Sequence, residues 1–439
     1  MEFLNYIIIA AIGALASVLA NKGIAVFNDG FRPIVPQYLE GKISRKELAT
    51  MSFAISFGLV VGFGIPTSIA ATIILIHSLL LTTDIIGTWC PDNFKGTIAA
   101  GVIGAVYGIG ILVGLEFIVQ LFAALPYNFL SALGGVSKYV TVVFAIFPAV
   151  AVGYQHGMKK GIISGIITIL VYFLVKKFGI FMVGNFKIAL NGEGMAMLSG
   201  TITMLFYAAT QKVESTDSNT TLVNVFSEKV ARIRKNWPLL AVMGALLAAA
   251  TSLSILAGDP ASLALLAAGS YSEAALAAFT RAIGFIPLVF TTAIVTGVYG
   301  PAGVTFVFAV GLALHGNPLV AAIAGAAVMI IELLLINVFA KGMDRFPGVK
   351  DMGEHIRTSM NKVLEVALLV GAVVAAETMS AAVGLSGIGA LFVIAVLLLN
   401  RMSKKPIVEL AIGPVATIAF GILLNVLIII KLVALIPVG

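Results

Sequence analysis

The run TIAAGVIGAVYGIGILVGLEFIVQLFAA at residues 97–124 contains a single charged side chain, Glu116. A helix of this composition is long enough to cross the hydrocarbon core of a bilayer, which takes about 20 apolar residues. Similar apolar segments occur at about 3–27, 50–64, 67–83, 139–156, 160–180, 193–210, 237–257, 272–298, 302–316, 318–340, 363–383, 386–400 and 406–435. The shorter ones are expected to be half-helices or re-entrant arms. The pattern predicts an all-α polytopic membrane protein with about 12–14 transmembrane or re-entrant helices.

The composition excludes a soluble enzyme and a disordered scaffold. Of the 439 residues, 60% are hydrophobic and 11% are charged, whereas soluble domains have about 45–50% apolar and 25% charged residues. The net charge of +7 comes from short basic clusters between apolar runs, at 42–46, 159–160, 229–235, 341–362 and 401–405. Such clusters are typical of cytoplasmic loops, so we expect no nucleic acid partner. The single cysteine, Cys90, excludes a cysteine-based metal cluster, and no His, Asp or Glu cluster has metal-ligand spacing. We therefore expect no metal, and we expect no cofactor.

A polar stretch divides the chain into two hydrophobic halves. We expect an N-terminal membrane repeat over 1–210, a polar cytoplasmic linker over 211–236, and a C-terminal membrane repeat over 237–439. Each half has seven apolar segments, and an odd number gives the two halves opposite orientations. The sequence therefore predicts two inverted-topology repeats.

Two Gly/Pro sequences at corresponding positions are expected to break helices. These are GFGIP at 62–66 and GVYGP at 297–301. Paired broken helices in inverted repeats indicate the binding site of a secondary transporter, because unwound backbone within a membrane must line a cavity or be covered by protein. Two ordinary tight turns are the alternative.

Polar residues around these breaks are the candidates for substrate binding. Arg281 is expected to bind a carboxylate or phosphate in a bidentate fork, with snorkelling to the membrane interface as the alternative. The other candidates are Gly64, Pro66, Thr67, Ser68, Thr83, Asp84, Thr291, Thr292, Thr296, Gly297, Tyr299 and Asn425.

Ionisable residues at membrane depth are candidates for coupling or gating. Glu116 and Glu332 fall in corresponding segments, and Glu365 opens a later one. A buried carboxylate of this kind can carry a coupling proton, and a sodium ion is the alternative coupling ion. Asp29 and Arg32, just after the first segment, are expected to form a gate. A structural hydrogen bond or ion pair between helices would explain the same glutamates.

Six stretches carry a resemblance to a known family. They are DGFRP at 29–33, TDIIG at 83–87, RAIGFIP at 281–287, GVY at 297–299, EVALLVG at 365–371 and GILLNVL at 421–427. Together they resemble the YhfT family of bacterial inner-membrane proteins over nearly the whole chain. The resemblance implies a multi-pass protein of the bacterial inner membrane with a role in transport, and it implies no substrate.

These observations predict a secondary-type transporter and not an enzyme. It would move a small polar, anionic metabolite through the lipid bilayer by alternating access, with an elevator movement within a homodimer as one form. The homodimer is expected by analogy with similar architectures. The alternatives are the permease subunit of a sugar phosphotransferase system, a membrane-embedded enzyme, and a receptor or scaffold.

Overall fold

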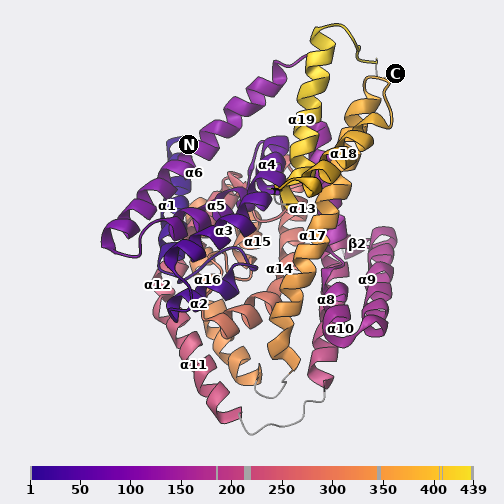
Figure 1. The fold of residues 1–439 in the computed structure, drawn as a ribbon. Helices are drawn as coiled ribbons and strands as arrows, with labels where there is room; N and C mark the ends of the chain where they lie inside the picture. Colours follow the sequence, from indigo (N-terminus) through magenta and orange to yellow (C-terminus); the bar gives the residue numbers. More distant parts are fainter. Residues whose placement is uncertain are drawn as a thin grey trace.

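The computed structural model describes residues 2–183, 186–211, 219–343, 348–404, 406–407 and 409–436. Part of the predicted linker (212–218) and parts of two basic clusters (344–347 and 405) lie outside the described residues. The described chain is helical almost throughout (Figure 1). The helices are α1 (Glu2–Asn21), η1 (Arg32–Ile34), α2 (Val35–Leu39), α3 (Arg45–Leu59), η2 (Val60–Gly64), α4 (Ile65–Ala71), α5 (Ile76–Trp89), α6 (Phe94–Ala123), α7 (Leu130–Phe144), α8 (Phe147–His156), α9 (Met158–Phe178), α10 (Gly192–Thr210), α11 (Asn219–Lys235), α12 (Trp237–Ser252), α13 (Pro260–Ala267), α14 (Tyr271–Thr296), α15 (Phe306–Ala313), α16 (Pro318–Met343), α17 (Gly348–Ala381), α18 (Ile388–Met402) and α19 (Glu409–Ile429).

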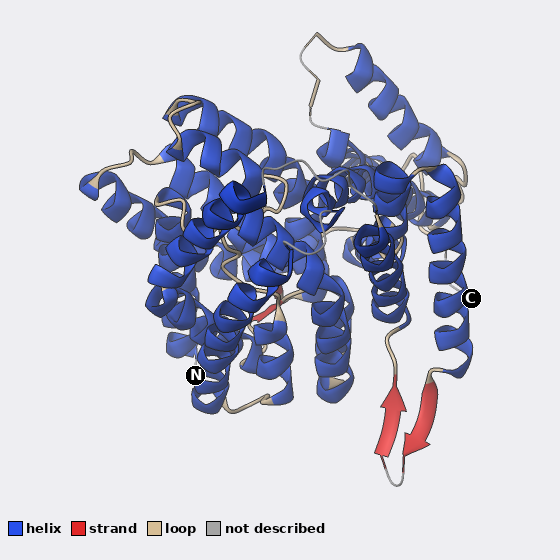
Figure 2. Cartoon of the chain, turned by 90° about the horizontal axis from the view of Figure 1, so that it is seen from below, coloured by secondary structure: helices blue, strands red, loops and turns tan. Residues whose placement is uncertain are grey.

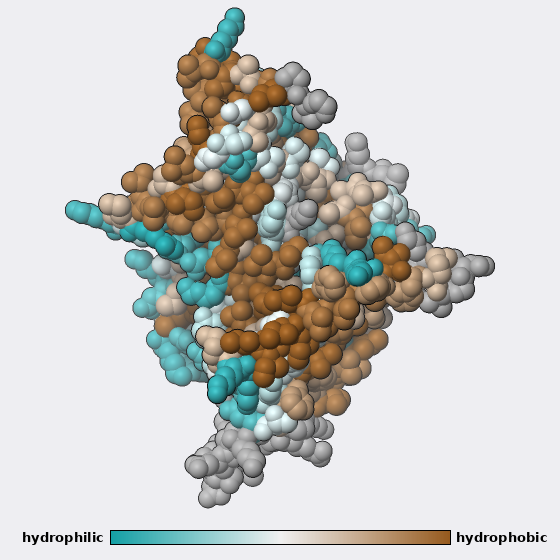
Figure 3. Space-filling view, turned by 90° about the vertical axis from the view of Figure 1, so that its right-hand side faces the viewer, coloured by the Kyte–Doolittle hydropathy of each residue, from teal (hydrophilic) through white to brown (hydrophobic). Residues whose placement is uncertain are grey.

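The architecture is that of a polytopic helical membrane protein. Among the described residues, 8 helices are long and apolar enough to cross a bilayer, and α7 with α8, bent by 41°, would make a ninth. In the most apolar part of each helix, 72% of the residues of α14 are buried, against 17% in α6 and 11% in α9. Helix α14 therefore belongs to the core, while α6 and α9 lie at opposite edges of the bundle (Figure 1). Figure 3 shows a broad hydrophobic area on one face, as contact with lipid tails requires.

Two short strand pairs accompany the helices. Strands β2 (Ile180–Val183) and β3 (Phe186–Ala189) form an antiparallel hairpin that projects away from the bundle (Figure 2). Strands β1 (Ile74–Leu75) and β4 (Leu256–Ala257) form a parallel pair inside the molecule. This inner pair joins two interruptions of helical structure in different halves of the chain.

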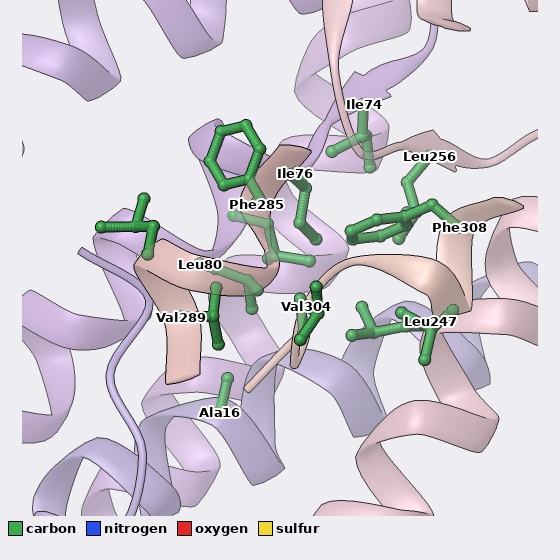
Figure 4. Packing of buried hydrophobic residues seen from close by; sticks show 14 of the residues in the cluster. Ala16, Ile74, Ile76, Leu80, Leu247, Leu256, Phe285, Val289, Val304 and Phe308 are labelled. Carbon is green, nitrogen blue, oxygen red and sulfur yellow. The ribbon is translucent and has the colours of Figure 1, made fainter. Parts of the chain in front are cut away.

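Four interruptions of helical structure meet in the interior as two similar crossings. In the first crossing, the Ile74 N–H donates to the Ile255 carbonyl at 3.0 Å. In the second, Ala25 bridges to Tyr299, and the Tyr299 N–H donates to the Ile24 carbonyl at 3.1 Å. Backbone donors that have left a helix are thereby satisfied away from water. Figure 4 shows Ile74, Leu256 and Phe308 packed against one another beside the first crossing.

The predicted break at 62–66 is wrong, whereas the one at 297–301 is confirmed. The chain stays helical from α3 through η2 into α4, because η2 is a π-helical stretch, an irregularity that a helix can contain without ending, and Pro66 follows two residues after its end. The interruption follows α4 instead, at Thr72, which has a φ of 58°. After α14 the chain leaves the helix at Gly297 and resumes helical structure only at Phe306.

The second part of the predicted linker is a docked helix. In α11, Val230 and Ile233 are each 1% exposed, and the helix packs against α14 and α16. Lys229 Nζ donates to the Val295 carbonyl at 2.6 Å, and an Arg232 Nη donates to the Gly23 carbonyl at 2.7 Å. Basic side chains stabilise the unpaired carbonyls at helix ends, so α11 attaches to the chain beside the second crossing.

Candidate functional site

A cavity of about 140 Å³, lined by both charged and apolar side chains, lies where the interrupted segments meet. Loops 27–30, 258–261 and 300–305 contribute to its wall, together with side chains of α5, α7, α14 and α17. Its polar lining includes Asn28, Asp29, Arg32, Asp259, Arg281 and Thr305, and its apolar lining includes Phe63, Leu81, Phe144, Met197 and Phe285. A cavity of about 150 Å³ holds a benzene-sized molecule, so this one suits a ligand of roughly six to eight non-hydrogen atoms.

Arg32 reaches the cavity from the 3₁₀-helix η1 and is 2% exposed. One Nη lies 2.7 Å from the Asp29 carboxylate, and Nε donates to the Val26 carbonyl at 3.4 Å. The other Nη is buried without a partner among the described residues. A buried donor that forms no hydrogen bond is costly, so the cavity offers this group to a ligand or to water.

Arg281 reaches the same cavity from α14, as the substrate-binding interpretation of the sequence requires. Its guanidinium lies 4.4 Å from the centre of the Phe285 ring, a cation–π distance. Its Nη1 donates to the Gly258 carbonyl at 3.4 Å, which is a long hydrogen bond. In the described part of the chain, no carboxylate forms an ion pair with it within 4.0 Å. The guanidinium fork therefore keeps most of its capacity to bind an anion.

Most of the cavity residues were not among the candidates from sequence, and Asp259, His77 and Thr305 are three of these. Asp259 is the N-cap of α13, and its carboxylate accepts hydrogen bonds from Ser262 N–H at 2.9 Å and Ser262 Oγ at 2.6 Å. His77 lies edge-on between Phe27 and Phe63, each 5.1 Å away between ring centres. Thr305 has a φ of 85°, and both His77 Nδ1 and Thr305 Oγ1 are buried without a partner among the described residues.

Two predicted carboxylates hold the loops of the cavity without lining it. Asp84 accepts the N–H groups of Phe27 and Asn28 at 2.9–3.0 Å. The Oε2 atom of Glu332 accepts the Tyr299 hydroxyl and the Val304 N–H, both at 2.8 Å. Loop 27–30 and loop 300–305 are each fixed by one buried carboxylate on a neighbouring helix.

Most of the predicted hydroxyl residues lie outside the cavity. Inside a helix, a Ser or Thr hydroxyl readily donates to the backbone carbonyl one turn earlier, and most of the predicted hydroxyl residues form this hydrogen bond. Ser68 donates to Gly64, Thr83 to Leu80, Thr291 to Pro287 and Thr296 to Thr292. Thr67 and Thr292 are buried. Gly64, Pro66 and Gly297 contribute backbone positions away from the cavity lining.

Three further candidates are not part of the cavity lining. Asn425 bonds to both backbone groups of Tyr127, and Glu365 forms an ion pair with Lys362 at 3.1 Å near the surface. Glu116 is exposed on α6, whereas Glu332 is 3% exposed. The expected equivalence of these two glutamates is therefore wrong, because α6 turns this side chain outward.

On the basis of fold and cavity, this chain is a multi-helix membrane protein with an internal cavity that charged side chains help to line. It belongs to the YhfT family. The family model, described as YhfT, a protein of unknown function, matches residues 5–433. The chain is 37% identical to the uncharacterized protein YhfT of Escherichia coli (strain K12). The alignment is 440 residues long and covers 97% of each chain. No solved structure matches the chain.

Proposed function

We propose that this chain is a secondary-type transporter, and not an enzyme, that carries a small polar metabolite with an anionic group across the bacterial inner membrane. The observation that carries the proposal is the cavity itself. Interrupted helices cross at a buried polar space that contains two arginines with available N–H donors. Charged groups at membrane depth are expensive and occur where an ion or substrate passes.

In this proposal the two halves of the chain are inverted repeats around the cavity. Left-handed backbone follows α1 at Gly23 (φ 59°) and α12 at Ser254 (φ 58°). It also follows α4 at Thr72 (φ 58°) and α14 at Gly297 (φ 71°). The two crossings use equivalent hydrogen bonds between the halves. The Ile74 N–H donates to the Ile255 carbonyl in one, and the Tyr299 N–H donates to the Ile24 carbonyl in the other. Such matched interruptions support a repeat with a shared central site.

Arg281 and Arg32 are the anion-binding residues of this proposal, and Glu332 is the coupling residue. The second carboxylate oxygen of Glu332, Oε1, is buried without a partner among the described residues, which leaves a position for a proton. Its hydrogen bonds to Tyr299 and Val304 link that proton to the loop that lines the cavity. The homodimer stays a prediction, which the mass of the detergent-solubilised particle tests.

Solute release from liposomes tests the proposed activity. Proteoliposomes loaded with a mixture of small carboxylates, amino acids among them, and phosphate esters are expected to lose at least one solute faster than protein-free liposomes, as read by mass spectrometry. Arg281→Gln should abolish that release. Arg234→Gln removes an exposed arginine of α11 and should leave it unchanged. Release of every solute at the protein-free rate, from liposomes containing folded protein, would count against transport of this class.

A further inference from the structure

The charged residues that line the cavity are balanced by counter-ions, with two exceptions. Arg32 pairs with Asp29 at 2.7 Å, Glu193 with Lys176 at 3.0 Å, and Arg357 lies 3.9 Å from Glu354. In the part of the chain that the structure describes, Arg281 and Asp259 form no ion pair within 4.0 Å. One cation and one anion thus line the same small space without a direct ion-pair partner among the described residues.

These two residues are neighbours in the wall. Arg281 Nη1 donates to the carbonyl of Gly258, the residue directly before Asp259. Asp259 is 2% exposed, and among the described residues its carboxylate accepts hydrogen bonds from Ser262 alone, although a carboxylate has about four acceptor positions. A gap wider than an ion pair therefore separates two complementary charges, and each has unused hydrogen-bonding capacity.

The charge balance selects among possible ligands. A simple anion would neutralise Arg281 and leave Asp259 as a buried uncompensated charge, and a simple cation would do the reverse. Uncompensated buried charges are strongly unfavourable. A molecule that carries an ammonium group and a carboxylate on the same carbon atom would satisfy the two residues together, and the buried free Nη of Arg32 supplies a further donor to its carboxylate.

Building on the proposed function, we infer that the ligand of this cavity is a small zwitterion of the α-amino acid type. Its carboxylate binds Arg281 and its ammonium group binds Asp259. The volume of about 140 Å³ limits it to roughly six to eight non-hydrogen atoms. The apolar wall of Leu81, Phe144 and Met197 accommodates a short aliphatic side chain.

A matched set of probes tests this inference on the full chain in detergent. L-2-aminobutyrate carries both charges, butyrate lacks the ammonium group, and propylamine lacks the carboxylate. Alanine, serine and valine with their deaminated acids extend the set. Titration calorimetry should show binding of at least one amino acid, with affinity for its acid and amine roughly 10- to 100-fold weaker.

Two variants test which charged group of the ligand each residue binds. Asn caps a helix as well as Asp does, so Asp259→Asn keeps the start of α13 and removes only the charge. It should weaken amino acid binding roughly 10- to 100-fold and leave the deaminated acid unaffected. Arg281→Gln should weaken both, and the exposed Arg234→Gln neither.

Three results would overturn the inference. They are equal affinity for an amino acid and its deaminated acid, unchanged amino acid binding in Asp259→Asn, and no binding of any probe. The first of these would leave transport of a simple anion standing. Release of carboxylates or phosphate esters from liposomes is measured separately, so failure of the transport proposal is distinguishable from failure of this inference.

Discussion

Gly303 lies where the cavity loop touches its anchoring carboxylate. Its φ is +57°, and a Cβ at this position would overlap Glu332 Oε2. Gly316 has a similar φ of +79° with nothing within 4 Å of a Cβ, which makes it the matched control. Gly316→Ala should cost about 1–2 kcal/mol of backbone strain. Gly303→Ala should cost about 1–3 kcal/mol more from overlap.

Thermal unfolding of both glycine variants in the same detergent measures this difference. Equal melting temperatures for Gly303→Ala and Gly316→Ala would contradict the close contact between the loop and Glu332.

Glu332 allows its structural and coupling roles to be separated. Glu332→Ala leaves the Tyr299 hydroxyl and the Val304 N–H buried without an acceptor, at about 1–3 kcal/mol for each group. Glu332→Gln keeps an acceptor oxygen but carries no exchangeable acid proton. We therefore expect Glu332→Ala to lower the melting temperature strongly. Glu332→Gln should stay folded, retain solute exchange and lose uptake driven by a pH gradient.

A Glu332→Gln protein that accumulates substrate along a pH gradient as wild type does would exclude Glu332 as the coupling residue. A Glu332→Ala protein as stable as wild type would contradict the anchoring role.

At the scale of elements, helix α11 donates hydrogen bonds to backbone carbonyls at the ends of both α1 and α14. Lys229→Met keeps the length of the side chain but loses the hydrogen bond to the Val295 carbonyl, and it should cost about 1–2 kcal/mol. The exposed Arg234→Met is the control. Denaturation of both variants in detergent measures the difference, and equal stability would mean that the contact contributes nothing.

The same lysine gives a pH dependence in the alkaline range. Burial lowers the pKa of Lys229 below its ordinary value, although the Glu40 carboxylate acts in the opposite direction. The unfolded chain therefore keeps this proton to a higher pH than the folded one. The contribution of Lys229 to stability should rise as the pH passes from the folded towards the unfolded pKa. This increment should be absent in Lys229→Met.

An element could be predicted from the sequence where a local pattern, such as an apolar run or a Gly or Pro residue, marks it. Long apolar runs such as 97–124 predict spans directly, and Gly297 marks a true helix end. The break at Thr72 carries no Gly or Pro. A threonine adopts positive φ there, and the tertiary hydrogen bond from the Ile74 N–H to the Ile255 carbonyl holds the chain two residues later. The Gly258-Asp259-Pro260 sequence is typical of the start of a helix, and it lies inside an apolar region. It would have indicated Asp259.

At the scale of the molecule, the site depends on residues from both halves of the chain. Arg32, Asp29 and His77 come from the first half, and Asp259, Arg281 and Thr305 from the second. Arg281 was predicted because a charge in an apolar span stands out. The meeting of loops 27–30, 258–261 and 300–305 is a tertiary result that no local pattern specifies.

The most direct test of alternating access is the labelling of a cysteine in the cavity from each side of the membrane. Cys90→Ser gives a thiol-free background, and Thr305→Cys places one thiol in the cavity lining. Sealed vesicles of both orientations are treated with a membrane-impermeant thiol reagent. We predict labelling from each side, with protection by a bound amino acid. Labelling from one side only, or from neither side, would contradict a transporter built around this cavity.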